Sequence, residues 1–135
     1  MNSPLLALDI GFRRTGVALS ENGLLSQPLT VLEARPPHMH GVVQNVVRLV
    51  REHEARTLVV GLPYGEDGLP TPQSARVEKV VRLIEEELRL QGIEAETVRL
   101  SEFHSTQDAR QLFPGFDSDS AAAALILQDY LSQTA

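Results

Sequence analysis

Apolar runs near the N-terminus predict three short β-strands in succession. Residues 4–10 (PLLALDI) are almost continuously apolar, and residues 15–20 (TGVALS) form a second run after the turn Gly11–Arg14. A third, shorter stretch covers residues 29–32, and Pro36-Pro37 ends the series. Short runs of strand formers separated by turn residues are typical of hairpins, so we expect a three-stranded meander here.

The rest of the chain alternates between helical and strand-like patterns. Apolar residues recur every three or four positions over residues 38–54, and again in a helix that begins at Pro72 after a Thr71 cap. Between them, residues 56–63 (RTLVVGLP) predict a strand buried on both faces, followed by a loop. Beyond Gly92 the sequence predicts a strand over 93–100, a short helix over 105–112 and a final helix over 118–131.

This order of elements predicts an α/β protein with a mixed five-stranded sheet. A three-strand meander followed by alternating helices and strands implies antiparallel and parallel strands in one sheet, flanked by helices. Ligands of such sheets bind outside the carboxyl ends of the strands. Asp9 ends the first strand and Glu102 follows the last one, so we expect both acids at this edge.

The composition fits a single cytoplasmic domain. The 135 residues match the usual length of one domain, 1–135, and the absence of cysteine excludes disulfides and thiolate metal sites. The chain has no signal-type N-terminus and no apolar run long enough to span a membrane. We therefore expect a soluble, cytoplasmic protein with no membrane partner.

The charge balance gives two opposing indications about nucleic acid. The net charge of −6 argues against a nucleic-acid partner. However, eleven of the twelve basic residues are arginine, whose guanidinium suits bidentate contacts with phosphate. A GC-rich genome would also enrich arginine, so the composition leaves both explanations open.

Three acids far apart in the chain, Asp9, Glu102 and Asp119, are the candidates for catalysis. Each also has a structural explanation: Asp9 can brace the hairpin turn, Glu102 can be a solvated acid, and Asp119 or Asp117 can cap the last helix. If the three converge, their mutual repulsion raises their pKa values unless a cation neutralises them. Mg²⁺ and Mn²⁺ prefer carboxylate oxygens, and two such ions can activate water and stabilise the leaving oxygen in phosphodiester hydrolysis.

Three motifs, in order over nearly the whole chain, resemble the YqgF/RuvX family. LALDIGFRRTGVALSE resembles the opening signature, and LVVGLPYGEDGLPTPQSARV resembles the valine-glycine-leucine-proline strand with its following loop and helix. DSDSAAAALILQDYL is similar to the family's C-terminal helix. The resemblance implies a ribonuclease H-like fold, a likeness to Holliday junction resolvases, and a nuclease that matures the precursor of 16S ribosomal RNA.

The resemblance also implies roles for individual residues. Asp9, Glu102 and Asp119 match the family's acidic ligands, which implies a two-metal site for Mg²⁺ or Mn²⁺, and Arg14 matches the arginine of the opening signature. Arg13 and Arg14, at the hairpin tip, are candidates to bind the substrate backbone, although a solvated turn is the alternative. The implied partners are structured RNA, including ribosomal small-subunit precursors, or branched DNA.

The chain departs from the family pattern around Glu102. Where the family usually has aspartate-glutamate-arginine, this chain has Ser101-Glu102-Phe103, so a flanking acid and a phosphate contact are absent. Nearby His104 fits either a proton shuttle or a polar loop residue. A basic flank on the second long helix fits either a phosphate-tracking surface or a solvated face; it consists of Arg76, Lys79 and Arg82.

Three functions compete at this point. A metal-dependent endonuclease acting on pre-16S ribosomal RNA, or on Holliday junctions, accounts for all three acids. Nucleotide binding is the second, because DIGFRRTG also resembles the first phosphate loop of actin-like sugar kinases. The third is a non-catalytic RNA-binding module for ribosome assembly, which Ser101, Phe103 and the acidic charge would favour. We favour the nuclease; the choice of RNA or DNA and the oligomeric state stay open.

Overall fold

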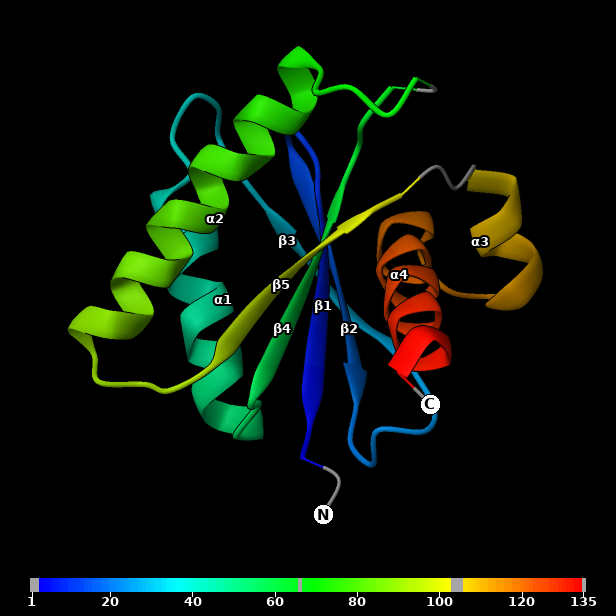
Figure 1. Ribbon diagram of the computed structural model, residues 1–135, viewed down its shortest axis with the longest axis horizontal. Helices are drawn as coiled ribbons and strands as arrows, with labels where there is room; N and C mark the ends of the chain where they lie inside the picture. The colour runs from blue at the N-terminus through cyan, green and yellow to red at the C-terminus, as the bar shows by residue number, and fades with distance from the viewer. Residues whose placement is uncertain (1–2, 66, 103–105, 135) are drawn as a thin grey trace.

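The computed structural model describes residues 3–65, 67–102 and 106–134, and shows one β-sheet with helices on both faces (Figure 1). The elements in chain order are β1 (Leu5–Ile10), β2 (Arg14–Ser20), β3 (Gln27–Glu33), α1 (His40–His53), β4 (Thr57–Leu62), α2 (Pro72–Leu90), β5 (Glu96–Ser101), α3 (Thr106–Leu112) and α4 (Ser118–Thr134).

The strand order confirms the predicted mixed sheet. The five strands lie in the order β3-β2-β1-β4-β5. The meander β1–β2–β3 is antiparallel, whereas β4 pairs in parallel with both β1 and β5. The carboxyl ends of β1, β4 and β5 therefore meet at one edge of the sheet, where α2 and α4 also begin (Figure 1).

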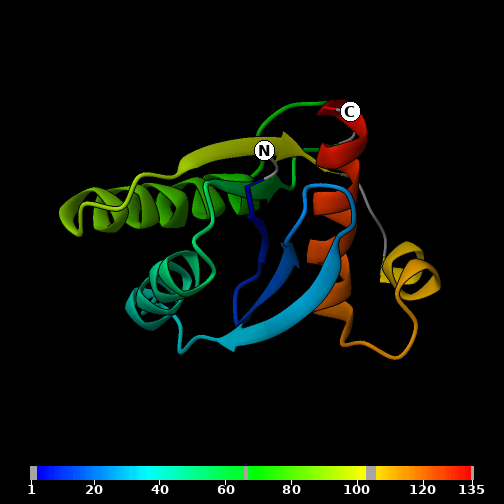
Figure 2. The same cartoon turned by 90° about the horizontal axis from the view of Figure 1, so that it is seen from below.

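The helices cover the two faces of the sheet separately. Helices α1 and α2 lie on one face and α4 lies on the other, with α3 packed on the outside of α4 (Figure 2). Alternate residues of β1 point to the two sides: Leu6 and Leu8 join the core under α1 and α2, and Leu5 and Ala7 join the core under α4. Both faces are buried, which explains why β1 and β4 are apolar at almost every position.

The face under α4 is built from small residues, and this brings the helix close to the sheet. Ala7 and Ala18 are fully buried there, opposite buried alanines of α4. At Gly16, a Cβ atom would lie 1.8 Å from the backbone oxygen of Asp119, so only glycine fits under the first turn of α4. This contact fixes the N-terminal end of α4 against β2.

Several predicted boundaries shift by two or three residues, for local reasons. The first helix begins at His40 rather than 38, because Arg35 and His38 form an isolated bridge in the preceding turn. The strand expected from residue 93 begins at Glu96, because Ile93 instead closes α2 by donating its N–H to Leu88. The strand expected over 29–32 extends to Gln27–Glu33 at the edge of the sheet.

The start of α2 confirms the predicted cap. The Thr71 hydroxyl accepts a hydrogen bond from the N–H of Ser74 at 3.0 Å, and the Ser74 hydroxyl accepts one from the N–H of Thr71 at 2.8 Å. This reciprocal pair is a capping box, with Pro72 at the first helical position.

Over the part of the chain that the structure describes, no helix combines the length and apolarity needed to cross a membrane.

The close contact between Gly16 and the first turn of α4 leads to a prediction about stability. We expect Gly16→Ala to lower the free energy of unfolding by about 2–3 kcal/mol, because the new methyl group forces α4 away from the sheet. Gly41→Ala is the matched control: nothing lies within 4 Å of its added Cβ, so helix propensity should make it neutral or slightly stabilising. Urea unfolding of both variants measures the difference, and equal effects would contradict the close packing.

Candidate active site

Two acids line a small cavity at the sheet edge where β1, β4 and β5 end. Asp9 is the second-last residue of β1, and Glu102 directly follows β5, where its N–H donates to the carbonyl of Leu62 at 3.0 Å. Gly61 of β4 lies between them. The cavity has a volume of about 80 Å³ and is lined by Asp9, Gly61, Pro63, Glu102, Ala122 and Ile126.

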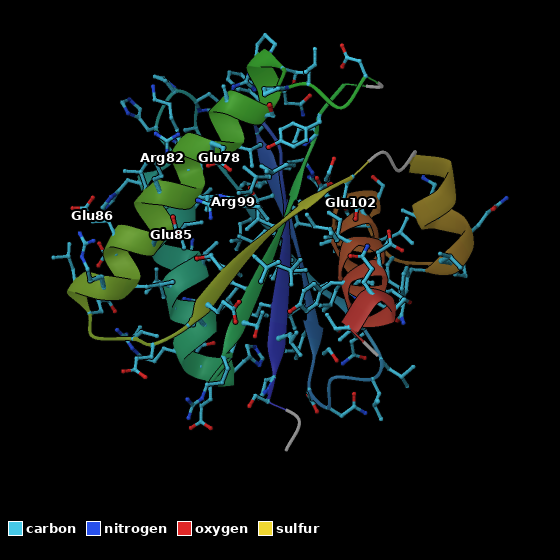
Figure 3. All side chains as sticks on the ribbon, in the orientation of Figure 1. Glu78, Arg82, Glu85, Glu86, Arg99 and Glu102 are labelled. Atoms are coloured by element: carbon cyan, nitrogen blue, oxygen red, sulfur yellow. The ribbon has the colours of Figure 1, made fainter. Side chains whose placement is uncertain are left out.

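The parity of β5 directs Glu102 toward α4. Arg99 of the same strand points the other way, to α2, where it pairs with Glu78 at 2.7 Å and Glu85 at 3.0 Å (Figure 3). Because residues 99 and 102 are separated by an odd number of positions, their side chains lie on opposite faces of the sheet. Glu102 therefore lies on the same face as Asp9, under α4.

One face of α4 supplies the other wall of the cavity. Asp119, Ala122, Ile126 and Asp129 follow the spacing of a single helix face, and the middle two line the cavity. Gly16 and Gly61 make room for this face: a Cβ at Gly61 would lie 2.5 Å from the Ile126 side chain. Gly16 also pairs with Asp9 across the β1–β2 ladder. The contact that seats α4 is thus next to the Asp9 backbone.

Burial makes both cavity acids hard to ionise. Burial raises the pKa of Asp9 to about 6, and the charge of Asp119 adds to the rise. Burial also raises the pKa of Glu102 to about 8, with contributions from the charge and hydrogen bond of Asp129 and from the charge of Asp9. The acids thus raise one another's pKa values in a site that is partly shielded from solvent, and additional negative charge is unfavourable there.

Arg14 holds the third candidate acid, Asp119. Its Nε donates to Asp119 Oδ2 at 2.6 Å and its Nη2 donates to Asp117 Oδ2 at 2.5 Å, while Glu33 lies 3.6 Å from its Nη1. The hydrogen bond to Asp119 contributes most to raising the pKa of the Arg14 guanidinium, and the hydrogen bond to Asp117 adds to it. The side chains of Arg14 and Asp119 are 43% and 34% exposed, so this pairing is accessible to solvent and can exchange partners.

Asp117 caps α4, which leaves Asp119 for the site. The N–H of Asp119 donates to Asp117 Oδ1 at 2.8 Å, and this bond is the main reason why the pKa of Asp117 is lowered. Ser120 Oγ donates to the Asp117 carbonyl at 3.1 Å. Of the two acids that the sequence offered as caps, Asp117 has this role.

The structure brings the predicted site residues together only in part. Asp9 and Glu102 share the cavity, whereas the carboxylate of Asp119 is turned to Arg14. In residues 3–65, 67–102 and 109–134, no three acidic or histidine side chains are arranged to hold a metal ion. Arg13 contacts the ring of Phe12, with its Cζ 5.9 Å from the ring centroid. Phe103, His104 and Ser105 lie outside the described residues.

The donor set nevertheless fits a divalent cation. Two half-buried carboxylates, those of Asp9 and Glu102, line one cavity with raised pKa values. A hard cation with oxygen ligands would remove the cost of ionising both. Asp119 is close enough to Asp9 to affect its pKa and could contribute a further oxygen once separated from Arg14.

Sequence reasoning missed two parts of this site. Asp129 raises the pKa of Glu102, and its spacing from Asp119 on one face of α4 was a readable signal. The partners of Arg14 could not be predicted from the sequence, because Asp117 and Glu33 come from segments that are distant from it in the chain. For the hairpin-bracing alternative, the turn is closed by the Gly11 N–H to Arg14 carbonyl bond, with no described bond to Asp9.

A larger hollow in the described surface lies away from these acids. It has a volume of about 790 Å³ and sits where α2 ends and β5 begins, with Arg56, Arg89 and Glu94 in its lining. These are the amino ends of β4 and β5, whereas sites on such sheets form at the carboxyl ends. We therefore place the candidate site at the small acidic cavity.

Comparisons with known proteins find a matching family and named relatives over almost the whole chain. A family model described as RuvX, Holliday junction resolvase, matches residues 3–133. The chain is 36% identical to the "Putative pre-16S rRNA nuclease" of Chloroflexus aggregans, over 94% of this chain and 92% of that protein. It is 34% identical to the protein of the same name from Dehalococcoides mccartyi, over 93% of this chain and 95% of that protein.

Solved structures share the fold at low sequence identity. T. thermophilus RuvC in complex with a Holliday junction substrate matches with a TM-score of 0.67 and 12% identity, over 97% of this chain and 94% of that chain. The yeast mitochondrial Holliday junction resolvase Ydc2 matches with a TM-score of 0.55 and 9% identity, over 97% and 84%. These likenesses confirm the expected ribonuclease H-like fold.

The raised pKa of Asp9 predicts how stability depends on pH. Its pKa is about 6 in the folded protein and ordinarily 3.8, so the folded state binds more protons between these values. Stability is therefore lost as the pH rises through about 6, and the raised pKa of Glu102 extends the loss toward about 8. We expect Asp9→Asn to exceed wild type by about 2 kcal/mol near pH 8 without metal, and by almost nothing near pH 4.

Urea unfolding across this pH range in metal-free buffer tests the expectation. Glu94→Gln, which changes an exposed acid, is the control and should follow the wild type. A constant difference between Asp9→Asn and wild type at all pH values would show that the Asp9 carboxyl does not titrate as described.

Proposed function

The chain belongs to the RuvX family and is a nuclease of that family, and we propose that it uses divalent metal ions to cleave the precursor of 16S ribosomal RNA. The observation that carries the metal dependence is the cavity in which Asp9 and Glu102 lie together with raised pKa values. Cleavage of this RNA is supported by relatives that bear the name pre-16S rRNA nuclease. Cleavage of a ribosomal RNA precursor would place the protein in the cytoplasm.

Asp9 and Glu102 would hold the Mg²⁺ or Mn²⁺, with Asp119 as a third ligand. When bound, the metal would supply an activated water for attack on phosphorus and a positive charge beside the departing oxygen. The residues of the cavity wall do the rest. Gly61 leaves space for the Ile126 side chain, and Ala122 and Ile126, which line the cavity, would limit the access of bulk water on the α4 side.

Arg14 would link substrate binding to completion of this site. Without substrate, its guanidinium neutralises Asp117 and Asp119. A phosphate offers the same bidentate geometry as a carboxylate, so a substrate phosphate can replace these acids on Arg14. Asp119 would then be released beside Asp9, where the cation needs it. Arg13, in the same turn, would add a second positive charge for the substrate backbone.

A Holliday junction resolvase is the second candidate function. The family description favours it, and the fold is shared with RuvC, whose structure includes a junction substrate. Both substrates present the same phosphodiester to the cavity. A non-catalytic RNA-binding module is less well supported, because a binder would gain from losing the acidic groups of Asp9 and Glu102.

Cleavage assays with Mn²⁺ test the proposal. Purified protein is incubated with a pre-16S RNA fragment and, separately, with a four-way DNA junction. We expect the RNA to be cleaved, and Asp9→Asn to lower the rate by on the order of 10²–10³, the usual loss for one preorganised electrostatic contact. Glu94→Gln should retain the rate. Equal cleavage by Asp9→Asn, or no cleavage of either substrate, would contradict the metal-nuclease account, and cleavage of the junction alone would favour the second candidate.

A further inference from the structure

An exposed aromatic ring stands at the tip of the β1–β2 hairpin. Phe12 is 49% exposed and belongs to none of the described core clusters. A single exposed apolar residue is ordinary in itself. The arginines that surround this one make it unusual.

Two guanidinium groups lie over the Phe12 ring. The Cζ of Arg76 is 4.9 Å from the ring centroid and that of Arg13 is 5.9 Å away, both within cation–π range. Arg76 comes from α2, so its contact ties the hairpin tip to a second element and restricts the ring. Among the described residues, neither arginine forms an ion pair with an acid, unlike Arg14, so both remain available for phosphate.

Two connections keep the cluster of Phe12, Arg13 and Arg76 near the acidic cavity. Phe12 follows Asp9 by three residues, so their Cα atoms are separated by at most about 11 Å. On the other side, Pro63 lines the cavity, and its carbonyl accepts a hydrogen bond from the hydroxyl of Thr71, the N-cap of α2, at 2.9 Å. The ring therefore lies within a few nucleotides of any phosphate bound in the cavity.

An aromatic ring flanked by free guanidinium groups is the chemistry that binds single-stranded nucleic acid. Unpaired bases stack on such rings, and the cations take the adjacent phosphates. A duplex hides its base faces, so the ring can reach only bases that are unpaired. We propose that Phe12, Arg13 and Arg76 form a stacking platform that holds an unpaired base beside the scissile phosphate. The inference rests on the proposed nuclease function and specifies that the substrate is single-stranded next to the cleavage site.

The test measures binding without cleavage, in EDTA. The probes are a blunt duplex and the same duplex with a single-stranded extension of about ten nucleotides, enough for one single-strand site, that carries 2-aminopurine. Each probe is made as RNA and as DNA. Stacking on a ring changes 2-aminopurine fluorescence, so affinity and stacking are read together.

The variants separate stacking from general apolar or charge effects. Phe12→Leu keeps an apolar side chain without a ring, and we expect about tenfold weaker binding of the extension and no fluorescence change. Phe12→Trp should retain both signals. Arg76→Gln should weaken binding, whereas Arg89→Gln, an exposed arginine at the other end of α2, should not. The blunt duplex should be insensitive to Phe12.

The outcomes distinguish this inference from the proposed function. If Phe12→Leu binds the extension as tightly as wild type, or weakens the blunt duplex equally, the stacking platform is wrong even when the wild type cleaves RNA with Mn²⁺. If wild type shows Phe12-dependent binding but never cleaves, the platform stands and the nuclease proposal falls. Tighter binding of the RNA extension or of the DNA extension identifies which nucleic acid the stacking platform prefers.

Discussion

The close packing of α4 on the sheet is the contact on which the candidate site depends. The backbone of Asp119 occupies the space where a Cβ of Gly16 would be, and Gly16 pairs with Asp9 on the neighbouring strand. Small residues on this face let the helix descend to the strand ends. The same approach that buries apolar surface therefore brings helix carboxylates next to the strand carboxylates, and it shields them from water.

This arrangement has an electrostatic cost, and the protein meets it in two different ways. At the solvent-exposed side, Arg14 neutralises Asp119 and Asp117 directly. In the cavity, Asp9 and Glu102 hold their protons more tightly, because burial and the neighbouring acids raise their pKa values. Acids with perturbed pKa values that lie in a cavity are candidates for a functional site. A substrate phosphate on Arg14 and a cation in the cavity would relieve both costs at once.

Much of the fold was readable from the sequence because its signals are local. Apolar runs, the Thr71 cap and the order of elements predicted the mixed sheet, and the positions of Asp9 and Glu102 at strand ends predicted their common edge. The pairing of Arg14 with Asp117, and of Phe12 with Arg76, was not readable, because segments far apart in the chain meet there. The strand start at Glu96 was misjudged because helix closure uses Ile93, a backbone effect that periodicity does not record.

We propose that a divalent cation offsets the cost of ionising the half-buried pair Asp9 and Glu102. Calorimetric titration of the substrate-free protein with Mn²⁺, near neutral pH and at low salt, addresses this without reference to any substrate. We expect saturable binding by the wild type and by Glu94→Gln, and a loss of affinity of at least about tenfold in Asp9→Asn, the size expected when a site loses one of its few charged ligands. Absence of Mn²⁺ binding in the wild type, or undiminished binding by Asp9→Asn, would contradict it.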